Sequence, residues 1–202
     1  MSAFRFVSEF SKEGFLEQGV EGLRVVRAKE LMDRWLAASQ RRVPEIPARW
    51  ILNQKSDALR SALRAFALPD RVPRNTKNPV RLRLLRERPR ICLGLFAAAE
   101  ALGLGIVHGV QPYLYLERMG EESIEKLGLS TKGGEPNADV FARIPGNRES
   151  LFRGAVVKDQ VAASDVIQVW LDVSHHPARG KEQADLIWRR VLGPALDGGI
   201  ES

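Results

Sequence analysis

Residues 4–26 read FRFVSEFSKEGFLEQGVEGLRVV, and this stretch decides how the N-terminal part of the chain folds. Phe6 and Phe10 are four residues apart, so they share one face of a helix while polar residues occupy the rest of its surface. Gly14 stands where glycine commonly ends a helix. The spacing therefore predicts a helix over roughly residues 3–13.

The second half of this stretch predicts a small hairpin. Residues 15–17 and 23–26 are apolar enough to pair as short strands around GVEG, whose glycines allow a turn with positive φ. A helix followed by a hairpin is the second half of a winged helix-turn-helix, in which an earlier helix braces the one that reads DNA. The same helix could instead serve as a packing element or a dimer contact.

Composition indicates an ordinary globular protein with a core. The chain has 202 residues, 44% of them hydrophobic, and a single cysteine, Cys92, in an apolar run. We expect Cys92 to be a buried reduced thiol, which fits a cytoplasmic protein. The most apolar window, residues 91–107, contains Glu100 and is too short to cross a membrane, and the first residues do not have the pattern of a signal peptide.

Positive charge is concentrated in one segment, residues 71–90. Against one acid, Glu87, this segment holds eight basic residues: Arg71, Arg74, Lys77, Arg81, Arg83, Arg86, Arg88 and Arg90. The net charge of +6 therefore arises entirely there. Such a segment favours contact with a polyanion. A solvated basic surface explains it equally well.

The rest of the chain alternates helical and strand patterns. AKELMDRWLAAS at 28–39 has the apolar spacing of a helix, and prolines 44 and 47 follow it. We expect a partial winged-helix-like module over 1–40 and a mixed sheet domain over 41–202, which makes the fold α+β (mixed α/β).

The second domain is predicted to begin with a short strand at ARWILN (48–53) and a helix capped by Ser56, and further strands and helices follow. VRLRLL (80–85), PYLYLER, ADVFARI and GAVVKD read as strands, with Arg81, Arg83 and Arg86 projecting from one side of the first. Cys92–Leu104 reads as a buried helix, and EESIEKLGL as a short helix ended by Gly128. The segments 161–173 and 181–192 read as two amphipathic helices that pack as a hairpin against the sheet.

The sequence contains no motif for catalysis or metal binding. His175 and His176 are neighbours on a predicted turn, where they cannot easily face one metal, and His108 has no acidic or cysteine partner nearby in sequence. Asp139 and Glu149 suggest a metal-dependent nuclease pair, but Leu151 stands where that pattern needs a basic residue. We expect Asp139 to be a strand-entry residue and the protein to act by binding, without a cofactor or metal.

Several separate stretches, taken in order, resemble one family. They are VSEFSKEGFLEQGVEGLRVVRA, KELMDRWLAAS, CLGLFAAAEALGL followed by PYLYLER, ADVFARI, and VIQVWLDVSHHPARGKEQADLIWRRVL. Together they are similar to the AbiEi-type antitoxins of type IV toxin–antitoxin systems. The last stretch carries most of the resemblance, because it resembles the closing helices of that family. One helix contains an aromatic residue followed by LD, the loop after it contains Pro and Arg, and the next helix contains Ala-x-x-Ile-Trp.

The resemblance implies a winged-helix module that represses its own operon and an α/β domain that counters a toxin resembling a nucleotidyltransferase. It also implies that residues 6–12 correspond to the recognition helix and that the winged helix is truncated, since family members carry further helices before it. Repressors of this kind commonly form homodimers. The residues implied or expected to contact DNA are Arg5, Ser8 and Lys12 on the helix, Arg24 and Arg27 on or after the wing, and Arg81, Arg83 and Arg86.

The leading hypothesis is therefore a cytoplasmic, DNA-associated transcriptional regulator that binds operator DNA, a nucleotidyltransferase-like toxin, or both, and that is not an enzyme. The alternative is a protein-interaction module that has lost DNA binding. A nuclease that uses Asp139 is a third, less favoured class.

Overall fold

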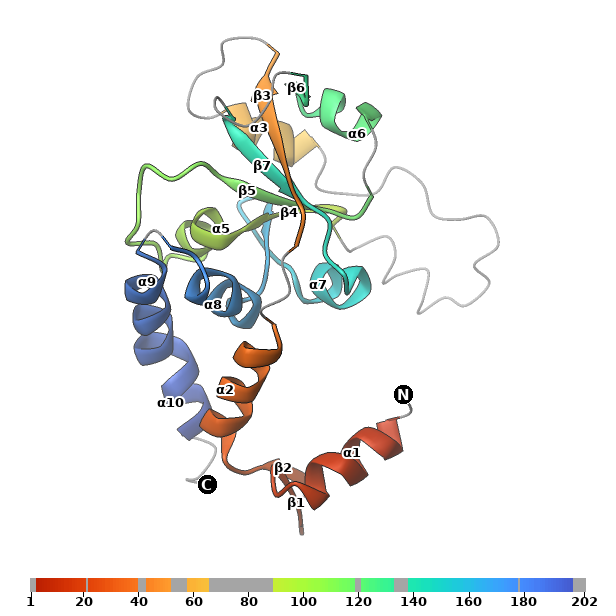
Figure 1. The fold of residues 1–202 in the computed structure, drawn as a ribbon, viewed down its shortest axis with the longest axis vertical. Helices are drawn as coiled ribbons and strands as arrows, with labels where there is room; N and C mark the ends of the chain where they lie inside the picture. Colours follow the sequence, from red (N-terminus) through yellow and green to blue (C-terminus); the bar gives the residue numbers. More distant parts are fainter. Residues whose placement is uncertain are drawn as a thin grey trace, which may run out of the picture. The chain divides into compact units, whose positions relative to one another are not determined.

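The computed structural model in Figure 1 describes residues 3–20, 22–39, 43–51, 58–65, 89–118, 121–132, 138–177 and 179–197. The chain forms two compact units. The first combines residues 1–41 with 188–202, and the second spans residues 42–187. The predicted mixture of helices and strands is confirmed.

The first unit begins with the expected helix and hairpin. Helix α1 (Ala3–Lys12) is followed by β1 (Leu16–Gly19) and β2 (Gly22–Val25), which form a two-stranded antiparallel sheet. Gly14 ends the helix with a φ of 75°, and Gly22 begins the second strand with a φ of 122°. Both values lie in a region that side chains disfavour, so glycine is required at these two positions.

Three helical segments complete the first unit. They are α2 (Ala28–Ala38), the π-helical turn η2 (Trp188–Leu192) and α10 (Gly193–Asp197). Helices α2 and α10 lie in contact, and the Lys29 ammonium lies 5.4 Å from the centre of the Trp188 ring. The end of the chain is thus part of the same unit as the N-terminal helix and hairpin.

A seven-stranded mixed sheet forms the centre of the second unit, with the strand order β6-β3-β7-β5-β4-β9-β8. Its strands are β3 (Glu45–Trp50), β4 (Ile91–Gly94), β5 (Tyr113–Leu116), β6 (Leu129–Ser130), β7 (Val140–Arg143), β8 (Val156–Lys158) and β9 (Val161–Ala163). Every residue of β4, β5 and β9 is buried. Because successive side chains face opposite sides of a sheet, both faces are covered at its centre.

Six described helices belong to the second unit: α3 (Ala58–Ala65), α5 (Leu95–Ala101), α6 (Glu121–Lys126), α7 (Arg148–Gly154), α8 (Val166–Ser174) and α9 (Gly180–Ile187). Helices α8 and α9 pack together as the predicted hairpin (Figure 1). The side chain of Asp165 caps α8 by accepting hydrogen bonds from the backbone N–H groups of Ile167 and Gln168 at 2.9 and 3.0 Å.

Two predicted helices are wrong in part. The segment predicted as a helix over Cys92–Leu104 begins as strand β4 and becomes helix α5 only at Leu95, whose φ is 48°. Residues 161–163, expected to begin a helix, form β9. In both places an apolar segment is buried on all sides, so hydrophobic periodicity cannot separate strand from helix.

No helix among the described residues has the length and hydropathy needed to span a bilayer.

Candidate functional site

The polar residues expected to face DNA share one side of α1. With 3.6 residues per turn, Arg5, Ser8 and Lys12 fall on the helix face opposite Phe6 and Phe10. The two phenylalanine rings stack with their centres 4.2 Å apart, and the Phe10 ring lies 6.1 Å from that of Phe15. Phe10 is thus partly covered beside Phe15, whereas Phe6 remains 47% exposed, and Arg5 and Lys12 on the opposite face are exposed.

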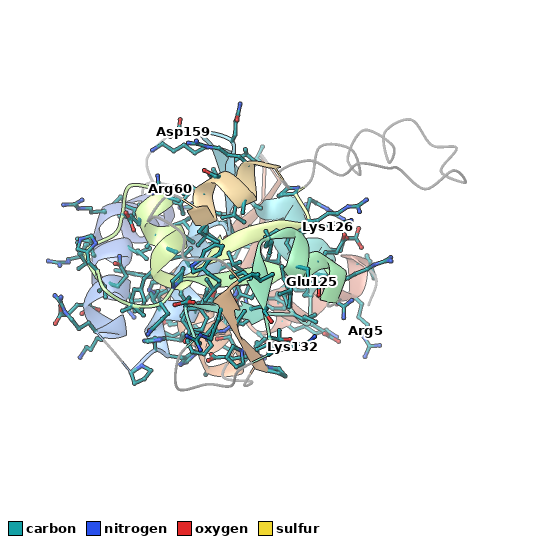
Figure 2. The ribbon with its side chains drawn as sticks, turned by 90° about the horizontal axis from the view of Figure 1, so that it is seen from above. Arg5, Arg60, Glu125, Lys126, Lys132 and Asp159 are labelled. Carbon is teal, nitrogen blue, oxygen red and sulfur yellow. The ribbon has the colours of Figure 1, made fainter. Side chains whose placement is uncertain are left out.

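Arg5 is held by a local ion pair. Its Nε donates to Glu9 Oε1 at 3.0 Å, one helical turn further on. Figure 2 shows the Arg5 side chain projecting outward from the ribbon. Exposed pairs of this kind contribute little to stability, so a phosphate could replace Glu9 at small cost.

The hairpin presents a largely exposed surface beside α1. Every residue of β2 is exposed, and Arg24 lies directly opposite Glu17 in the strand register. Val20 is completely exposed at the tip of the turn. Arg24 is thus an exposed residue of the ribbon.

Arg27 has a different environment from Arg24. Its guanidinium lies 5.2 Å from the centre of the Phe15 ring, its Nε donates to Glu30 at 2.5 Å, and its Nη1 donates to the backbone oxygen of Glu13 at 3.5 Å. Arg27 also has a φ of 54°, just before α2 begins. This residue joins the hairpin to α2.

Sequence reasoning missed two residues of this region, Glu13 and Arg34. Both terminal nitrogens of Arg34 donate to the Glu13 carboxylate, and the Nη2–Oε1 distance is 3.2 Å. The hydrogen bond and the charge of Glu13 raise the pKa of Arg34. The Arg34 guanidinium lies 5.6 Å from the centre of the Phe15 ring. The two residues are 21 positions apart, so no local sequence signal connects them.

The remaining predicted DNA contacts, Arg81, Arg83 and Arg86, lie outside the described residues, as does the strand predicted for residues 80–85.

The second unit contains a partly buried polar network that sequence reasoning also missed. The Tyr115 hydroxyl donates to Asp172 Oδ2 at 2.8 Å, and Gln168 Nε2 donates to Asp172 Oδ1 at 2.9 Å. Burial raises the pKa of Asp172 to about 6, although both hydrogen bonds favour its charged form. Burial and the charge of Asp172 also raise the pKa of Tyr115. These contacts join α8 to β5.

The network continues across the sheet through Arg143. Its guanidinium lies 4.4 Å from the centre of the Tyr113 ring and donates through Nη2 to Glu45 on β3. The Tyr113 hydroxyl donates to the same Glu45 carboxylate at 3.4 Å. Within the described residues, the buried Nε of Arg143 has no hydrogen-bond partner. The contacts of Arg143 link β3, β5 and β7, and we interpret the network as structural.

Other candidates for chemistry have structural roles. Asp139 Oδ2 accepts a hydrogen bond from the backbone N–H of Trp50 at 3.0 Å, which confirms it as a residue that fixes the start of β7 against β3. The His176 ring lies edge-on to Phe96, with the ring centres 4.9 Å apart. Burial raises the pKa of Cys92 far above that of a reactive thiol. Among the residues the structure describes, no three His, Cys, Asp or Glu side chains could hold a metal ion.

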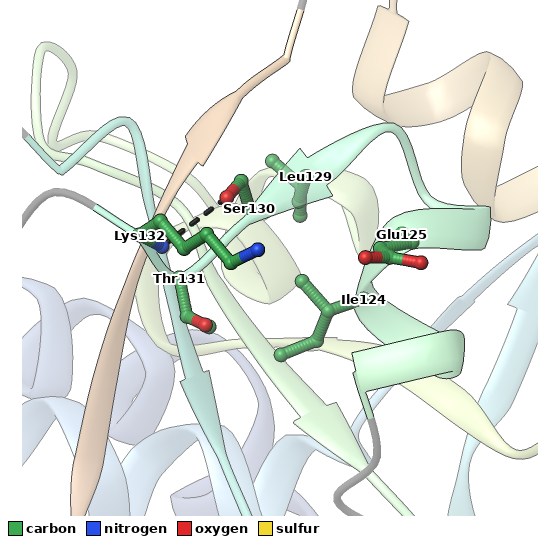
Figure 3. Close-up of a pocket in the computed structure, with 6 residues that line it drawn as sticks. All are labelled: Ile124, Glu125, Leu129, Ser130, Thr131 and Lys132. Carbon is green, nitrogen blue, oxygen red and sulfur yellow. Dashed lines mark hydrogen bonds between the residues drawn. The ribbon is translucent and has the colours of Figure 1, made fainter.

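A small hollow lies at the β6 edge of the sheet, and Figure 3 shows its six lining residues. They are Ile124, Glu125, Leu129, Ser130, Thr131 and Lys132. The Lys132 side chain extends toward Ile124 and Leu129, and the Lys132 backbone N–H donates to Ser130 Oγ at 3.2 Å. The lining combines helix α6, strand β6 and the two residues after that strand, and it carries no polar network comparable to the one around Asp172.

Comparison with known proteins yields no relative. No protein family, no curated protein and no solved structure matches this chain. Function must therefore be argued from the residues themselves.

Proposed function

We propose that this protein is a DNA-associated transcriptional regulator that acts by binding and not by catalysis, with α1 and the hairpin as its DNA contact. The observation that supports the proposal most strongly is the division of α1 into two faces. Arg5, Ser8 and Lys12 occupy the face opposite the stacked Phe6 and Phe10. A helix whose polar face lies opposite its aromatic face, followed by an exposed ribbon, fits the arrangement in which a recognition helix enters the major groove beside a wing.

The chemistry of these side chains suits the two kinds of DNA contact. Arg5 can donate two hydrogen bonds to the edge of a guanine, and Ser8 can pair with several bases. Lys12 and Arg24 are exposed cations suited to phosphate oxygens, which fix the position of a protein on the duplex. Arg5 and Ser8 would thus read the DNA sequence, and Lys12 and Arg24 would position the protein on the duplex.

A salt titration tests this proposal. Binding to a duplex from the region upstream of the protein's own coding sequence should weaken steeply with salt, because each phosphate contact releases counterions. Lys12→Ala and Arg24→Ala should each lower the slope of log affinity against log salt by about 1. No detectable binding at low salt would refute the DNA-binding proposal.

A second partner follows from the family resemblance. In that proposal the protein also binds a nucleotidyltransferase-like toxin, and coexpression with a toxin gene from an adjacent reading frame should yield a stable complex and suppress toxicity. A complex that forms without any DNA binding would favour the protein-interaction module instead. The exposure of Phe4, which reaches 84%, is the specific observation in favour of that alternative.

A further inference from the structure

Phe15 is the buried centre of the junction between α1, the hairpin and α2. It is only 7% exposed, although every residue of β2 beside it is exposed. Its backbone N–H donates to the Phe10 oxygen at 2.9 Å, and its own backbone oxygen accepts from Val26 at 2.9 Å. The backbone of Phe15 therefore ties the end of α1 to the end of β2.

Two guanidinium groups lie over the Phe15 ring, and Glu13 holds both. The Arg27 and Arg34 groups are 5.2 and 5.6 Å from the ring centre. Glu13 accepts from Arg34 through its carboxylate and from Arg27 through its backbone oxygen. Since Arg34 belongs to α2 and Glu13 to the turn after α1, these contacts connect elements that are distant in sequence.

We propose that Glu13, Phe15, Arg27 and Arg34 form a clamp, here called the Phe15 clamp, that holds α1 and the hairpin in the orientation that binds DNA. The inference rests on the proposed DNA-binding function. Arg27 and Arg34 are positioning residues in this proposal, because they contact Phe15 and Glu13. For Arg27 this role replaces the DNA contact expected from the sequence. Lys12 and Arg24 are the contrasting residues, which contact DNA directly.

The clamp requires arginine for a geometric reason. A planar guanidinium can stack on a ring and also donate two parallel hydrogen bonds to a carboxylate. A lysine ammonium keeps the charge but cannot make the paired hydrogen bonds. The substitution Arg34→Lys therefore distinguishes the two possible roles of Arg34. A phosphate contact would survive it, because a phosphate accepts hydrogen bonds from either cation, whereas the clamp would be lost.

The first experiment measures affinity for the upstream duplex at several salt concentrations. If the clamped orientation falls to about a tenth of the population in Arg34→Lys, affinity falls about tenfold. Arg34→Gln should weaken binding similarly and leave the salt slope unchanged, whereas Lys12→Ala should lower the slope by about 1. A lower slope in Arg34→Gln, together with near-normal binding by Arg34→Lys, would show that Arg34 contacts phosphate and would overturn the proposal.

A second experiment tests the clamp without DNA. Amide hydrogen exchange in the free, full-length protein should become faster at Phe15 and Val26 in Arg34→Gln and stay unchanged in Lys12→Ala. The double variant Glu13→Gln/Arg34→Gln should exchange no faster at these two amides than Arg34→Gln alone, because the two side chains act as a pair. Unchanged exchange in Arg34→Gln would overturn the clamp even if the wild-type protein binds DNA. If the wild type does not bind DNA, the proposed function fails, and this exchange result alone decides whether the clamp exists.

Discussion

The two units of the molecule use polar side chains in opposite ways. In the second unit, a hydrogen bond between Tyr115 and Asp172 joins helix α8 to β5, a central strand that is buried on both faces of the sheet. In the first unit, the pairs Arg5–Glu9 and Glu13–Arg34 lie at the surface around one buried aromatic ring, that of Phe15. A network packed between a helix and a sheet specifies a single packing, whereas an exposed pair such as Arg5–Glu9 can exchange its partner for a ligand. The polar contacts of the second unit thus support its packing, whereas those of the first unit lie at an exposed surface.

The largest expected effect is on the second unit, at Gly180. A Cβ at this position would lie 2.0 Å from the backbone oxygen of Val173, so α8 and α9 could not pack as they do. Gly180→Ala should reduce the free energy of unfolding by about 3 kcal/mol or more, measured by urea denaturation. Gly146→Ala is the matched control, because nothing lies within 4 Å of its Cβ. Equal stability of the two variants would contradict the packing of the helical hairpin.

The next effect concerns the first unit, at Phe15. Phe15→Ala removes its buried aromatic ring and should destabilise this unit by about 3 kcal/mol, seen as faster amide exchange in α1 and the hairpin. Phe4→Ala removes a ring that is 84% exposed and should change stability by no more than about 0.5 kcal/mol. If Phe4→Ala were the more damaging substitution, Phe4 would be covered by a partner in solution.

A third prediction uses the pH dependence of the buried network. The pKa of Asp172 is about 6 in the folded protein, against 3.8 ordinarily. The folded state therefore binds this proton more tightly, and Asp172 contributes stability below about pH 4 that is lost as the pH rises to about 6, at most about 3 kcal/mol. Asp172→Asn should abolish this loss, so its stability relative to the wild type should rise between pH 4 and pH 7. A constant difference across that range would contradict the burial of Asp172.

Local features were predictable from the sequence, and contacts between distant segments were not. The helix and hairpin of residues 3–26 follow from phenylalanine spacing and from Gly14, which act within a few residues. The strand at Ile91–Gly94 was mistaken for helix because its burial comes from neighbouring elements. Tyr115 and Asp172 are 57 residues apart, and Glu45 and Arg143 are 98 apart, so this polar network has no local pattern. The Phe15 clamp also joins residues that are distant in sequence, since Glu13 and Arg34 are 21 positions apart, so no local pattern predicts it.

The smallest expected effect concerns the exposed ion pair between Arg5 and Glu9 on α1. Glu9→Gln removes the carboxylate that holds Arg5 and should strengthen DNA binding by up to about fivefold, because exposed ion pairs are weak and a phosphate can replace them. Folding stability should change by no more than about 0.5 kcal/mol. Weaker binding in this variant would mean that Glu9 orients Arg5 for its DNA contact. A filter-binding or anisotropy assay at fixed salt is sufficient.

The central claim is that the polar face of α1 and the hairpin bind DNA. Its most direct test is the affinity of the full-length protein for its upstream duplex across salt concentrations, with the wild type compared to the double variant Lys12→Ala/Arg24→Ala. The account predicts steep salt dependence for the wild type and a slope lower by about 2 for the double variant. Identical slopes for the two proteins would contradict it.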